Sequence, residues 1–347
     1  MPTSETVFLI DGTAQMYRAY HAIRDLTGPD GKATNAVFGF VTMLRKLIND
    51  HQPALIAAAF DLRGPTFRTE IDANYKANRP PMPDDLSEQV AWVHEACQAL
   101  GVPVLTHERF EADDVIGTLT KQALENDLEV VIVTADKDFF QLVQPRVRIF
   151  NPRDHGLWYD ADGVKAKFGV SPEQVIDVLA LMGDAVDNVK GVPGIGEKGA
   201  RELITTFGSL DALLKQSEDV GKIRYRNALA QYPEDAKISR ELVTIRTDVP
   251  VFFDREKLRY QGPLSERCFA LFSSLGFRKL LADYAPTTAI VEKDYEVVRT
   301  ESDLRTLVDA INNAGQLSLA TLTDRLPPMQ AELVGLSLSV GPGHARY

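Results

Sequence analysis

The stretches VFLI (7–10), LIAAAF (55–60) and VVIVTA (130–135) decide the fold, because each is an apolar run of four to six residues bounded by polar ones. Runs of this length suit strands that are buried on both faces of a parallel sheet. Each run leads directly into an aspartate, and these are Asp11, Asp61 and Asp136. In an open α/β sheet the carboxyl ends of the strands form the edge where ligands bind. We therefore expect the three carboxylates to converge at one edge.

Six further carboxylates stand where predicted helices begin or end. They are Glu111, Asp113 and Asp114 in FEADDVIGTL (110–119), Asp138 in ADKDF (135–139), and Asp184 and Asp187 in LMGDAVDN (181–188). A single aspartate in such a place often only caps a helix or interacts favourably with its dipole, and this alternative stays open for Asp113 or Asp114 taken alone. Capping is a poor explanation for nine acids on the ends of several elements.

Nine like charges can share one crevice only if cations neutralise them. The expected ligands are all carboxylates, and oxygen-only sets of this kind suit hard ions such as Mg²⁺ or Mn²⁺. Two ions about 4 Å apart would polarise a phosphate, activate water and stabilise the leaving oxygen. The sequence therefore indicates hydrolysis of a phosphate ester.

The formal charge of −11 at pH 7 argues against a nucleic-acid partner only if it is spread over the surface. Residues 1–189 have a net charge of −11, but without the nine acids it is only −2, and residues 190–260 have a net charge of +2. The acidity thus belongs mainly to one site and does not exclude DNA. Two isolated cysteines, no signal peptide and no apolar span of about 20 residues indicate a cytoplasmic protein with no membrane partner.

Strand and helix patterns alternate over residues 1–175, which predicts an α/β fold with a mostly parallel sheet flanked by helices. We expect strands at 7–11, 55–60, 102–105 and 130–135, and helices at 86–100 and 111–125. From Pro172 the pattern becomes helical up to about residue 290. The stretch 286–294 is typical of a linker, and the β pattern that follows does not complete a sheet. We therefore expect residues 291–347 to begin a further domain of a longer protein.

The glycine-rich stretch GVPGIGEKGA (191–200) is a candidate contact for a phosphate backbone. Glycines allow close approach, and amides at the start of the following helix can face a phosphate. Such a stretch is often only a turn. Its place between two helical segments favours a helix–hairpin–helix that holds duplex DNA without reading its sequence. The candidate DNA-binding residues here are Gly191, Gly194, Gly196, Lys198 and Arg201.

Residues 63–79 predict a functional loop or arch, because a connection of this length without an apolar run is unusual in a compact domain. Its basic residues are Arg63, Arg68, Lys76 and Arg79, and they are interleaved with Phe67 and Tyr75. Basic groups contact phosphates and aromatic rings stack on bases in single-strand grooves. A solvated charged loop is the simpler alternative and stays open.

Seven motifs together show a family resemblance. They are LIDGTAQMYRAY (9–20), TNAVFGF (34–40), AAFDLRGPTFRTE (58–70), YKANRPPMP (75–83), FEADDVIGTL (110–119), VTADKDFFQLV (133–143) and ALMGDAVDNVKGVPGIGEKGA (180–200). In this order, over about residues 5–285, the chain resembles the 5′-nuclease (flap endonuclease-like) domain of bacterial DNA polymerase I. Residues 295–347 resemble the start of the adjoining 3′–5′ exonuclease-like domain.

The resemblance implies a PIN-like 5′-nuclease domain at 1–175, a helix–hairpin–helix DNA-binding region at 176–290 and a truncated exonuclease-like segment at 291–347. It assigns one metal to Asp11, Asp61, Glu111 and Asp113, a second to Asp113, Asp136, Asp138 and Asp187, and water-mediated support to Asp114 and Asp184. Lys76 and Arg79 would steer the scissile phosphate, with Tyr17, Arg18, Arg68 and Tyr75 on the DNA. The implied cofactors are two or more Mg²⁺ (or Mn²⁺) ions, with K⁺ at the hairpin. The implied partners are DNA with 5′ flaps or nicks and RNA–DNA primer junctions, bound by a monomer continuous with a polymerase region.

The chain departs from the family pattern at several positions, none of which removes a carboxylate. Ala135 replaces glycine, Ala185 and Val186 replace small hydroxyl residues, Lys190 replaces proline and Gly199 replaces threonine. The missing hydroxyl at 199 predicts a weaker hold on duplex DNA, for which Lys190 could compensate. In the last segment Ala320 and Leu322 stand where active exonucleases carry Asp-x-Glu, so we expect no 3′–5′ exonuclease activity from it.

Three other functions remain open from the residues alone. A haloacid-dehalogenase-like phosphatase would fit the DGT after a strand, but its nucleophile would stand at Leu9, which cannot attack phosphorus. A PIN-like ribonuclease would leave the long helical part unexplained. A DNA-binding clamp with an inactive site would be favoured by loss of a core acid, and all of them are present.

Overall fold

The computed structural model describes residues 5–153, 156–285, 294–324, 331–341 and 343–347. The chain divides into two compact units, residues 1–285 and residues 286–347, which are treated separately below. Within the described residues, no helix combines the length and the apolar character needed to span a membrane.

A six-stranded sheet organises the first unit. Its strands, in spatial order, are β3 (Val104–Leu105), β2 (Leu55–Ala59), β1 (Thr6–Asp11), β4 (Glu129–Val133), β5 (Val147–Asn151) and β6 (Leu157–Tyr159). All neighbours run parallel except β5 and β6. The predicted mostly parallel sheet is therefore confirmed. Strands β5 and β6 were not predicted, because exposed polar Arg148 interrupts the apolar pattern of β5 and β6 has only three residues.

The register of the central strands places their carboxyl ends together. Asp11 pairs with Ala59, and Ile10 pairs with Val133. Asp61 follows β2 by two residues and Asp136 follows β4 by three. The strand-end acids thus leave the sheet at one edge, as the apolar runs predicted.

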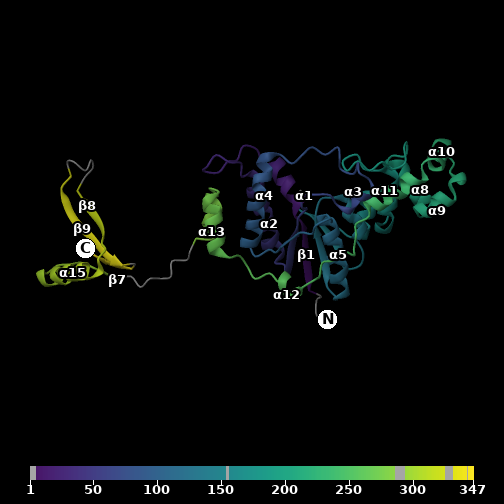
Figure 1. Ribbon diagram of the computed structural model, residues 1–347. Coiled ribbons are helices and arrows are strands. Elements are labelled where there is room, and N and C mark those ends of the chain that lie inside the picture. Colours follow the sequence, from purple (N-terminus) through teal and green to yellow (C-terminus); the bar gives the residue numbers. More distant parts are fainter. Residues whose placement is uncertain (1–4, 154–155, 286–293, 325–330, 342) are drawn as a thin grey trace. The chain divides into compact units, whose positions relative to one another are not determined.

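Helices cover both faces of this sheet because its strands alternate their buried side chains. Val7 and Leu9 of β1 belong to one apolar cluster, together with residues of α5 (Ala112–Glu125). Phe8 and Ile10 belong to a second cluster, formed with α1 (Gly12–Ala22), α2 (Asn35–His51), α4 (Asp84–Ala99) and α13 (Ser265–Ser274). Figure 1 shows α2 and α4 on one side of β1 and α5 on the other.

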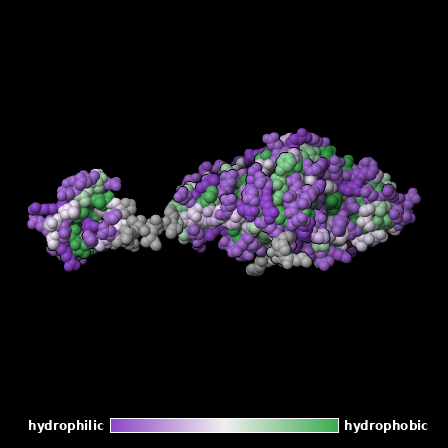
Figure 2. Space-filling view, turned by 90° about the horizontal axis from the view of Figure 1, so that it is seen from below, coloured by the Kyte–Doolittle hydropathy of each residue, from purple (hydrophilic) through white to green (hydrophobic). Residues whose placement is uncertain are grey.

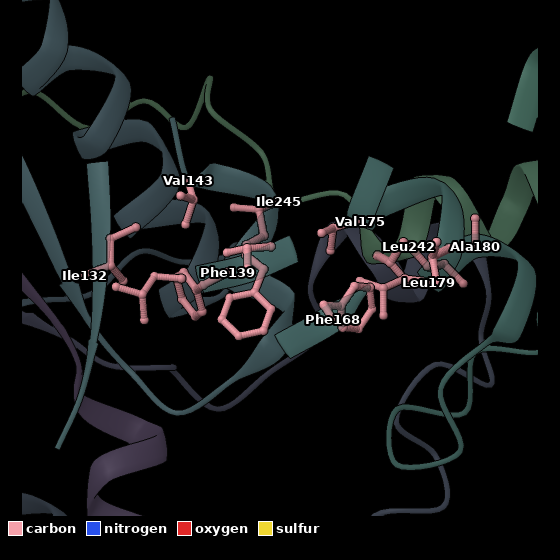
Figure 3. Packing of buried hydrophobic residues seen from close by; sticks show 14 of the residues in the cluster. Ile132, Phe139, Val143, Phe168, Val175, Leu179, Ala180, Leu242 and Ile245 are labelled. Atoms are coloured by element: carbon pink, nitrogen blue, oxygen red, sulfur yellow. The ribbon is translucent and has the colours of Figure 1, made fainter. Parts of the chain in front are cut away.

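The first cluster continues without a break into the helical part of the unit. It includes Ile132 of β4, Phe139 of the 3₁₀ helix η1 (Lys137–Leu142) and Leu179 of α7 (Val175–Met182), which are shown with their neighbours in Figure 3. Helices α8 (Glu197–Phe207), α9 (Leu210–Lys215), α10 (Ile223–Gln231) and α11 (Pro233–Val243) complete this part. The shared core fixes the helical part on the sheet. The chain then continues through α12 (Arg255–Leu258) and α13 to α14 (Arg278–Leu281), and α13 packs on α4.

The remaining short elements are α6 (Ala161–Phe168) and the 3₁₀ helices η2 (Pro172–Gln174) and η3 (Ser217–Asp219).

The segment 63–79, predicted as an arch, contains a short helix, α3 (Phe67–Ile71), that is fixed to the core by a buried ion pair. The Arg68 guanidinium donates to both carboxylate oxygens of Asp114 at 2.7 and 2.8 Å, and to the carbonyls of Leu242 (2.8 Å) and Thr244 (3.1 Å). Arg68 is 3% exposed and Asp114 is fully buried. One ion pair therefore joins α3, the start of α5 and the end of α11.

The second unit is a four-stranded sheet with one helix. Its strands lie in the order β7 (Asp294–Glu296), β10 (His344–Arg346), β9 (Leu333–Gly341) and β8 (Ser318–Thr323), and α15 (Glu301–Ala314) packs on β9. Helix α15 was not predicted, although Thr300 caps its start and Gly315 ends it. Leu319, Leu322, Leu333 and Leu336 are exposed, and Figure 2 shows apolar surface on this unit.

Arg68→Leu would leave Asp114 buried without its cation, so we expect the free energy of unfolding to fall by about 3–5 kcal/mol. Arg68→Leu combined with Asp114→Leu removes both charges and should recover most of this loss. Urea denaturation followed by circular dichroism measures both. Lys46→Leu is the matched control, because the pair of Lys46 with Asp50 is exposed and should contribute at most about 1 kcal/mol. A single variant as stable as the wild type would contradict the role of the buried pair.

Candidate active site

A cavity of about 460 Å³ lies at the carboxyl edge of the first unit's sheet. Eight of the nine predicted acids line it: Asp11, Asp61, Glu111, Asp113, Asp136, Asp138, Asp184 and Asp187. Tyr17, His21, Tyr75, Lys76 and Arg79 line it as well. The sequence-predicted carboxylate cluster is therefore present as one cavity wall, built from strand ends, helix starts and one turn.

Backbone amides and hydroxyls orient the acids at the strand ends. Asp11 caps α1 by accepting from the Ala14 amide at 3.0 Å, and its other oxygen accepts from the buried Thr134 hydroxyl at 2.8 Å. Asp61 accepts from the Ala112 amide at 2.7 Å, at the start of α5. The hydrogen bonds at the starts of these helices therefore also orient the carboxylates that line the cavity.

The turn after α7 brings in the last two acids. Asp184 accepts from the amides of Val186 (2.7 Å) and Asp187 (3.3 Å), which closes the turn. The 63–79 segment is hydrogen-bonded to this turn, since the Lys76 amide donates to the Asp187 carbonyl at 2.9 Å and the Asn78 side chain donates to the Ala185 carbonyl at 2.7 Å. The end of the predicted arch therefore forms one wall of the cavity.

Four cations pair with carboxylates of the cavity wall, and one of them is Arg68, which lies 3.4 Å from Glu111. Lys76 lies 2.8 Å from Glu111, Arg79 pairs with Asp187, and Lys137 lies 3.1 Å from Asp184. Lys76 and Arg79 were predicted to be here. Lys137 was missed, although its position between Asp136 and Asp138 in the sequence was a usable signal.

Burial, and after it repulsion between the carboxylates, raises the pKa of several acids in the cavity. Burial raises the pKa of Asp11 to about 7, against hydrogen bonds from Ala14 and Thr134 that favour the anion. Burial, followed by repulsion from Asp136, raises the pKa of Asp138 to about 8. Burial and the neighbouring Asp11 raise the pKa of Asp113 well above its usual value. Although burial opposes it, Lys137 holds the pKa of Asp184 below the usual value. The cavity therefore favours added positive charge.

The donor set fits hard divalent cations. Most of the cavity's candidate ligands are carboxylate oxygens, and the Oδ1 atom of Asp138 is buried with no hydrogen-bond partner in the described part of the chain. Across the described ranges, no three acidic, histidine or cysteine side chains converge closely enough to form a ready-made metal group. The carboxylates are instead spread along the wall, and Glu111, Asp184 and Asp187 are held by cations.

Three predicted site residues are buried and paired inside the protein. Asp114 does not line the cavity, because it pairs with Arg68 and also accepts from the backbone amides of Glu111 and Arg246. Arg68 also lines the cavity, but the same contacts leave it only 3% exposed. Tyr75 is 6% exposed, and its hydroxyl lies 3.2 Å from Glu111. The sequence did not show these contacts, because it does not tell which side chains pair inside the core. The metal-supporting role of Asp114 and the DNA contacts of Arg68 and Tyr75 stay predictions.

The two residues of α1 that were predicted to contact DNA, Tyr17 and Arg18, line different cavities. Tyr17 lines the carboxylate cavity, and His21 stacks on its ring with the centroids 6.5 Å apart. Arg18 lines a separate cavity between α1, α2 and Phe150. The structure therefore brings Tyr17 to the acids, adds His21, which the sequence analysis missed, and places Arg18 elsewhere.

The predicted hairpin precedes α8, and its glycines differ in role. Gly194 and Gly196 are exposed, and so is Lys198. Gly191 is buried at φ +62°, and its amide donates to the buried Ser239 hydroxyl at 3.0 Å. A Cβ atom there would lie 2.4 Å from the Gly183 nitrogen, so Gly191 serves packing and not, as predicted, phosphate contact.

Arg201 is partly engaged within the protein. It pairs with Glu197, and its guanidinium lies over the Phe168 ring at 4.9 Å from the centroid. Lys198 is the more available of the two predicted hairpin cations.

Two family models match the chain in succession. The model described as "5'-3' exonuclease, N-terminal resolvase-like domain" matches residues 6–169, and the model described as "5'-3' exonuclease, C-terminal SAM fold" matches residues 170–266. Together they cover the sheet, the carboxylate cavity and the hairpin. The chain therefore belongs to the 5′–3′ exonuclease family, and its first unit is a 5′–3′ exonuclease domain.

The chain is similar to the N-terminal region of bacterial DNA polymerase I. It is 41% identical to that of Pseudomonas aeruginosa over 98% of this chain and 39% of the relative. It is 39% identical to the thermostable enzyme of Thermus aquaticus over 80% of this chain and 33% of the relative. The chain thus spans less than half the length of these polymerases.

Solved structures share the fold at lower identity. The T5 5′-exonuclease with bound zinc aligns with a TM-score of 0.61 at 22% identity, covering 81% of this chain and 97% of that protein. The catalytic core of Rad2 in complex with DNA substrate aligns with a TM-score of 0.55 at 17% identity, covering 81% and 93%.

The raised carboxylate pKa values predict how stability depends on pH. The pKa of Asp138 lies near 8 in the folded chain, against a usual 3.8. Below pH 3.8 the carboxyl is neutral in both the folded and the unfolded chain and does not affect stability. Between pH 3.8 and 8 the unfolded chain ionises more readily, so the folded state loses stability as the pH rises. In protein treated with EDTA, Asp138→Asn cannot ionise. Its melting temperature should therefore exceed that of the wild type by a margin that is small at pH 4 and grows to several degrees at pH 8.

Differential scanning calorimetry at pH 4, 6 and 8 measures this margin. Asp219→Asn is the control, because Asp219 is exposed far from the cavity and should give the same margin at every pH. A pH-independent margin for Asp138→Asn would show that Asp138 ionises as freely in the folded as in the unfolded chain.

Proposed function

We propose that this chain is a structure-specific 5′-nuclease that hydrolyses phosphodiesters near 5′ flaps, nicks and RNA primers in DNA. The observation that carries the proposal is a single cavity lined by eight carboxylates and by Lys76 and Arg79, two cations that can bind a phosphate. The cavity lies within a 5′–3′ exonuclease domain. The Rad2 core is described in complex with DNA substrate and the T5 flap endonuclease in a pseudo-enzyme–product complex with DNA, which supports the same class of substrate here.

Two divalent ions, Mg²⁺ or Mn²⁺, fit the carboxylate wall. We assign one to Asp11, Asp61, Glu111 and Asp113 and the other to Asp113, Asp136, Asp138 and Asp187, with Asp184 supporting; K⁺ is proposed at the carbonyls of the turn before α8. The T5 neighbours were crystallised with metal ions, which supports metal binding in this fold. When bound, the divalent ions supply positive charge and make water easier to deprotonate.

The protein's own groups position the substrate. Lys76 and Arg79 give up their carboxylate partners to hold the scissile phosphate and to stabilise the charge that develops on it. The Tyr17 ring, on the same wall, is placed to stack on the terminal base. Attack by water in line with the leaving oxygen then leaves a 5′-phosphate on the product.

Several finer points follow from the family resemblance. We propose that the chain acts as a monomer in the cytoplasm, where its DNA substrate is found, and that it is normally continuous with a polymerase region, as in its relatives. Ala320 and Leu322 are both exposed on β8, with no carboxylate on either side chain. Residues 294–347 should therefore contribute no 3′–5′ exonuclease activity.

The rival functions predict different substrates. Leu9 is buried in the middle of β1, so a phosphatase nucleophile at that position is absent. Incubation of flapped DNA, single-stranded RNA and a small phosphomonoester with Mg²⁺, with and without chelator, separates the nuclease from the ribonuclease and phosphatase. Binding of flapped DNA without cleavage would instead favour an inactive clamp.

Asp113→Ala should reduce cleavage of flapped DNA by at least about a thousandfold, because Asp113 is assigned to both ions. Removing one of several crowded carboxylates relieves repulsion, so the variant should fold and melt no lower than the wild type. Single-turnover cleavage and thermal melting measure the two effects. Near-normal cleavage by Asp113→Ala would refute the assignment.

Lys76→Ala and Lys198→Ala should separate cleavage from duplex binding. Lys198 is exposed on the hairpin, so its loss should weaken duplex binding and lower the slope of log affinity against log salt by about 0.9. Lys76 lies in the cavity, so its loss should slow single-turnover cleavage and leave duplex affinity nearly unchanged. Equal loss of affinity in both variants would mean that cavity and hairpin are not separate contacts.

A further inference from the structure

Gly199, in the first turn of α8, has its side-chain space filled by a tyrosine from another helix. A Cβ atom built on Gly199 would lie 2.6 Å from the Tyr225 hydroxyl oxygen, 2.8 Å from Cζ and 3.1 Å from Cε2. Tyr225 belongs to α10, which Figure 1 shows near α8. The position that lacks a side chain is therefore occupied by the phenol end of Tyr225.

The Tyr225 ring is held in place while its hydroxyl stays available. The ring packs against the apolar core, and the Lys222 ammonium lies 5.0 Å from its centroid. Within the described ranges the hydroxyl has no hydrogen-bond partner, and its oxygen is not sealed from solvent. Because the ring is held in place and the hydroxyl is unpaired and accessible, the hydroxyl can donate a hydrogen bond to a ligand at little cost in conformational entropy.

The surroundings of this hydroxyl are positively charged. Lys198 is exposed next to Gly199 in the chain. The Arg224 guanidinium lies beside the hairpin, with Nη2 3.0 Å and Nε 3.1 Å from the position of a Cβ on Gly194. Lys222, on the other side of the ring, pairs with Glu202 at the surface. Cations on the hairpin and on α10 thus accompany the hydroxyl, and such groups form charge-assisted hydrogen bonds with phosphate oxygens.

We propose that Tyr225 donates a hydrogen bond to a backbone phosphate of duplex DNA, in place of a side chain at position 199. The proposal rests on the nuclease function proposed above and names a binding residue for it. It also revises two expectations from the sequence, namely that Gly199 weakens the binding of duplex DNA and that Lys190 compensates for it. The phenol hydroxyl lies 2.6 Å from where a Cβ of residue 199 would stand, so a hydroxyl is supplied next to this position by another helix.

Tyr225→Phe removes only the hydroxyl and keeps the ring packing. We expect duplex affinity to fall roughly three- to tenfold, as for one hydrogen bond, with an unchanged salt slope because the donor is neutral. Fluorescence anisotropy on a blunt duplex in EDTA, at four salt concentrations, measures both quantities. Tyr232→Phe is the matched control, because Tyr232 packs against the same core at the end of α10 and should leave affinity unchanged.

A compensating pair gives a second, independent test. Gly199→Thr alone forces its side chain into Tyr225 and should lower both the melting temperature and the affinity. Tyr225→Ala should lower affinity at least as much as Tyr225→Phe. Gly199→Thr combined with Tyr225→Ala places a hydroxyl in the vacated space and should restore affinity to within about twofold of the wild type.

Wild-type affinity in Tyr225→Phe would overturn the proposal, since the ring would then act only in packing. Failure of the double variant to exceed Tyr225→Ala would overturn it as well. Neither result depends on catalysis, because binding is measured in EDTA. If the wild type binds duplex but cuts no flap, the nuclease function fails while the affinities still decide the role of Tyr225.

Discussion

Electrostatic repulsion among eight carboxylates at one sheet edge is the constraint on which the rest of the site depends. Amides and hydroxyls orient the acids at the strand ends, as Thr134 does for Asp11. Lysine and arginine side chains neutralise those on the turn and at the start of α5. Asp11, Asp113, Asp136 and Asp138 keep raised pKa values. Because this repulsion is not fully compensated, the site favours the binding of cations, and bound cations in turn attract a phosphate.

The ion pair between Arg68 and Asp114 gives that wall its shape. A buried pair contributes little net stability, but it defines geometry because neither partner tolerates another environment. Here it joins α3, α5 and the end of α11, and so holds the 63–79 segment against the turn that carries Asp184 and Asp187. Asp114 therefore influences the cavity by positioning its walls, although its own carboxylate faces away from it.

The helical part shows how the packing around a glycine decides what that glycine does. Gly191 and Gly199 look equivalent in the sequence, yet one is buried against Gly183 and the other makes room for Tyr225. Both exploit the missing Cβ, the first for close backbone approach and the second to admit a side chain from α10. Of the predicted hairpin residues, Gly194, Gly196 and Lys198 are thus exposed, whereas Gly191 is buried.

The sequence by itself determined the parallel sheet, the edge where the acids meet and eight of the nine carboxylates there, because apolar runs and strand ends are local features with a fixed period. It did not determine β5, β6 or α15, whose signals are short or mixed. Only the tertiary structure decided that Arg68 and Asp114 pair across 46 positions of the chain, that Lys137 reaches Asp184, and that Tyr225 fills the space at Gly199. The physical reason is that local patterns report backbone preference and burial, whereas the partner of a charged or polar side chain depends on which distant elements pack around it.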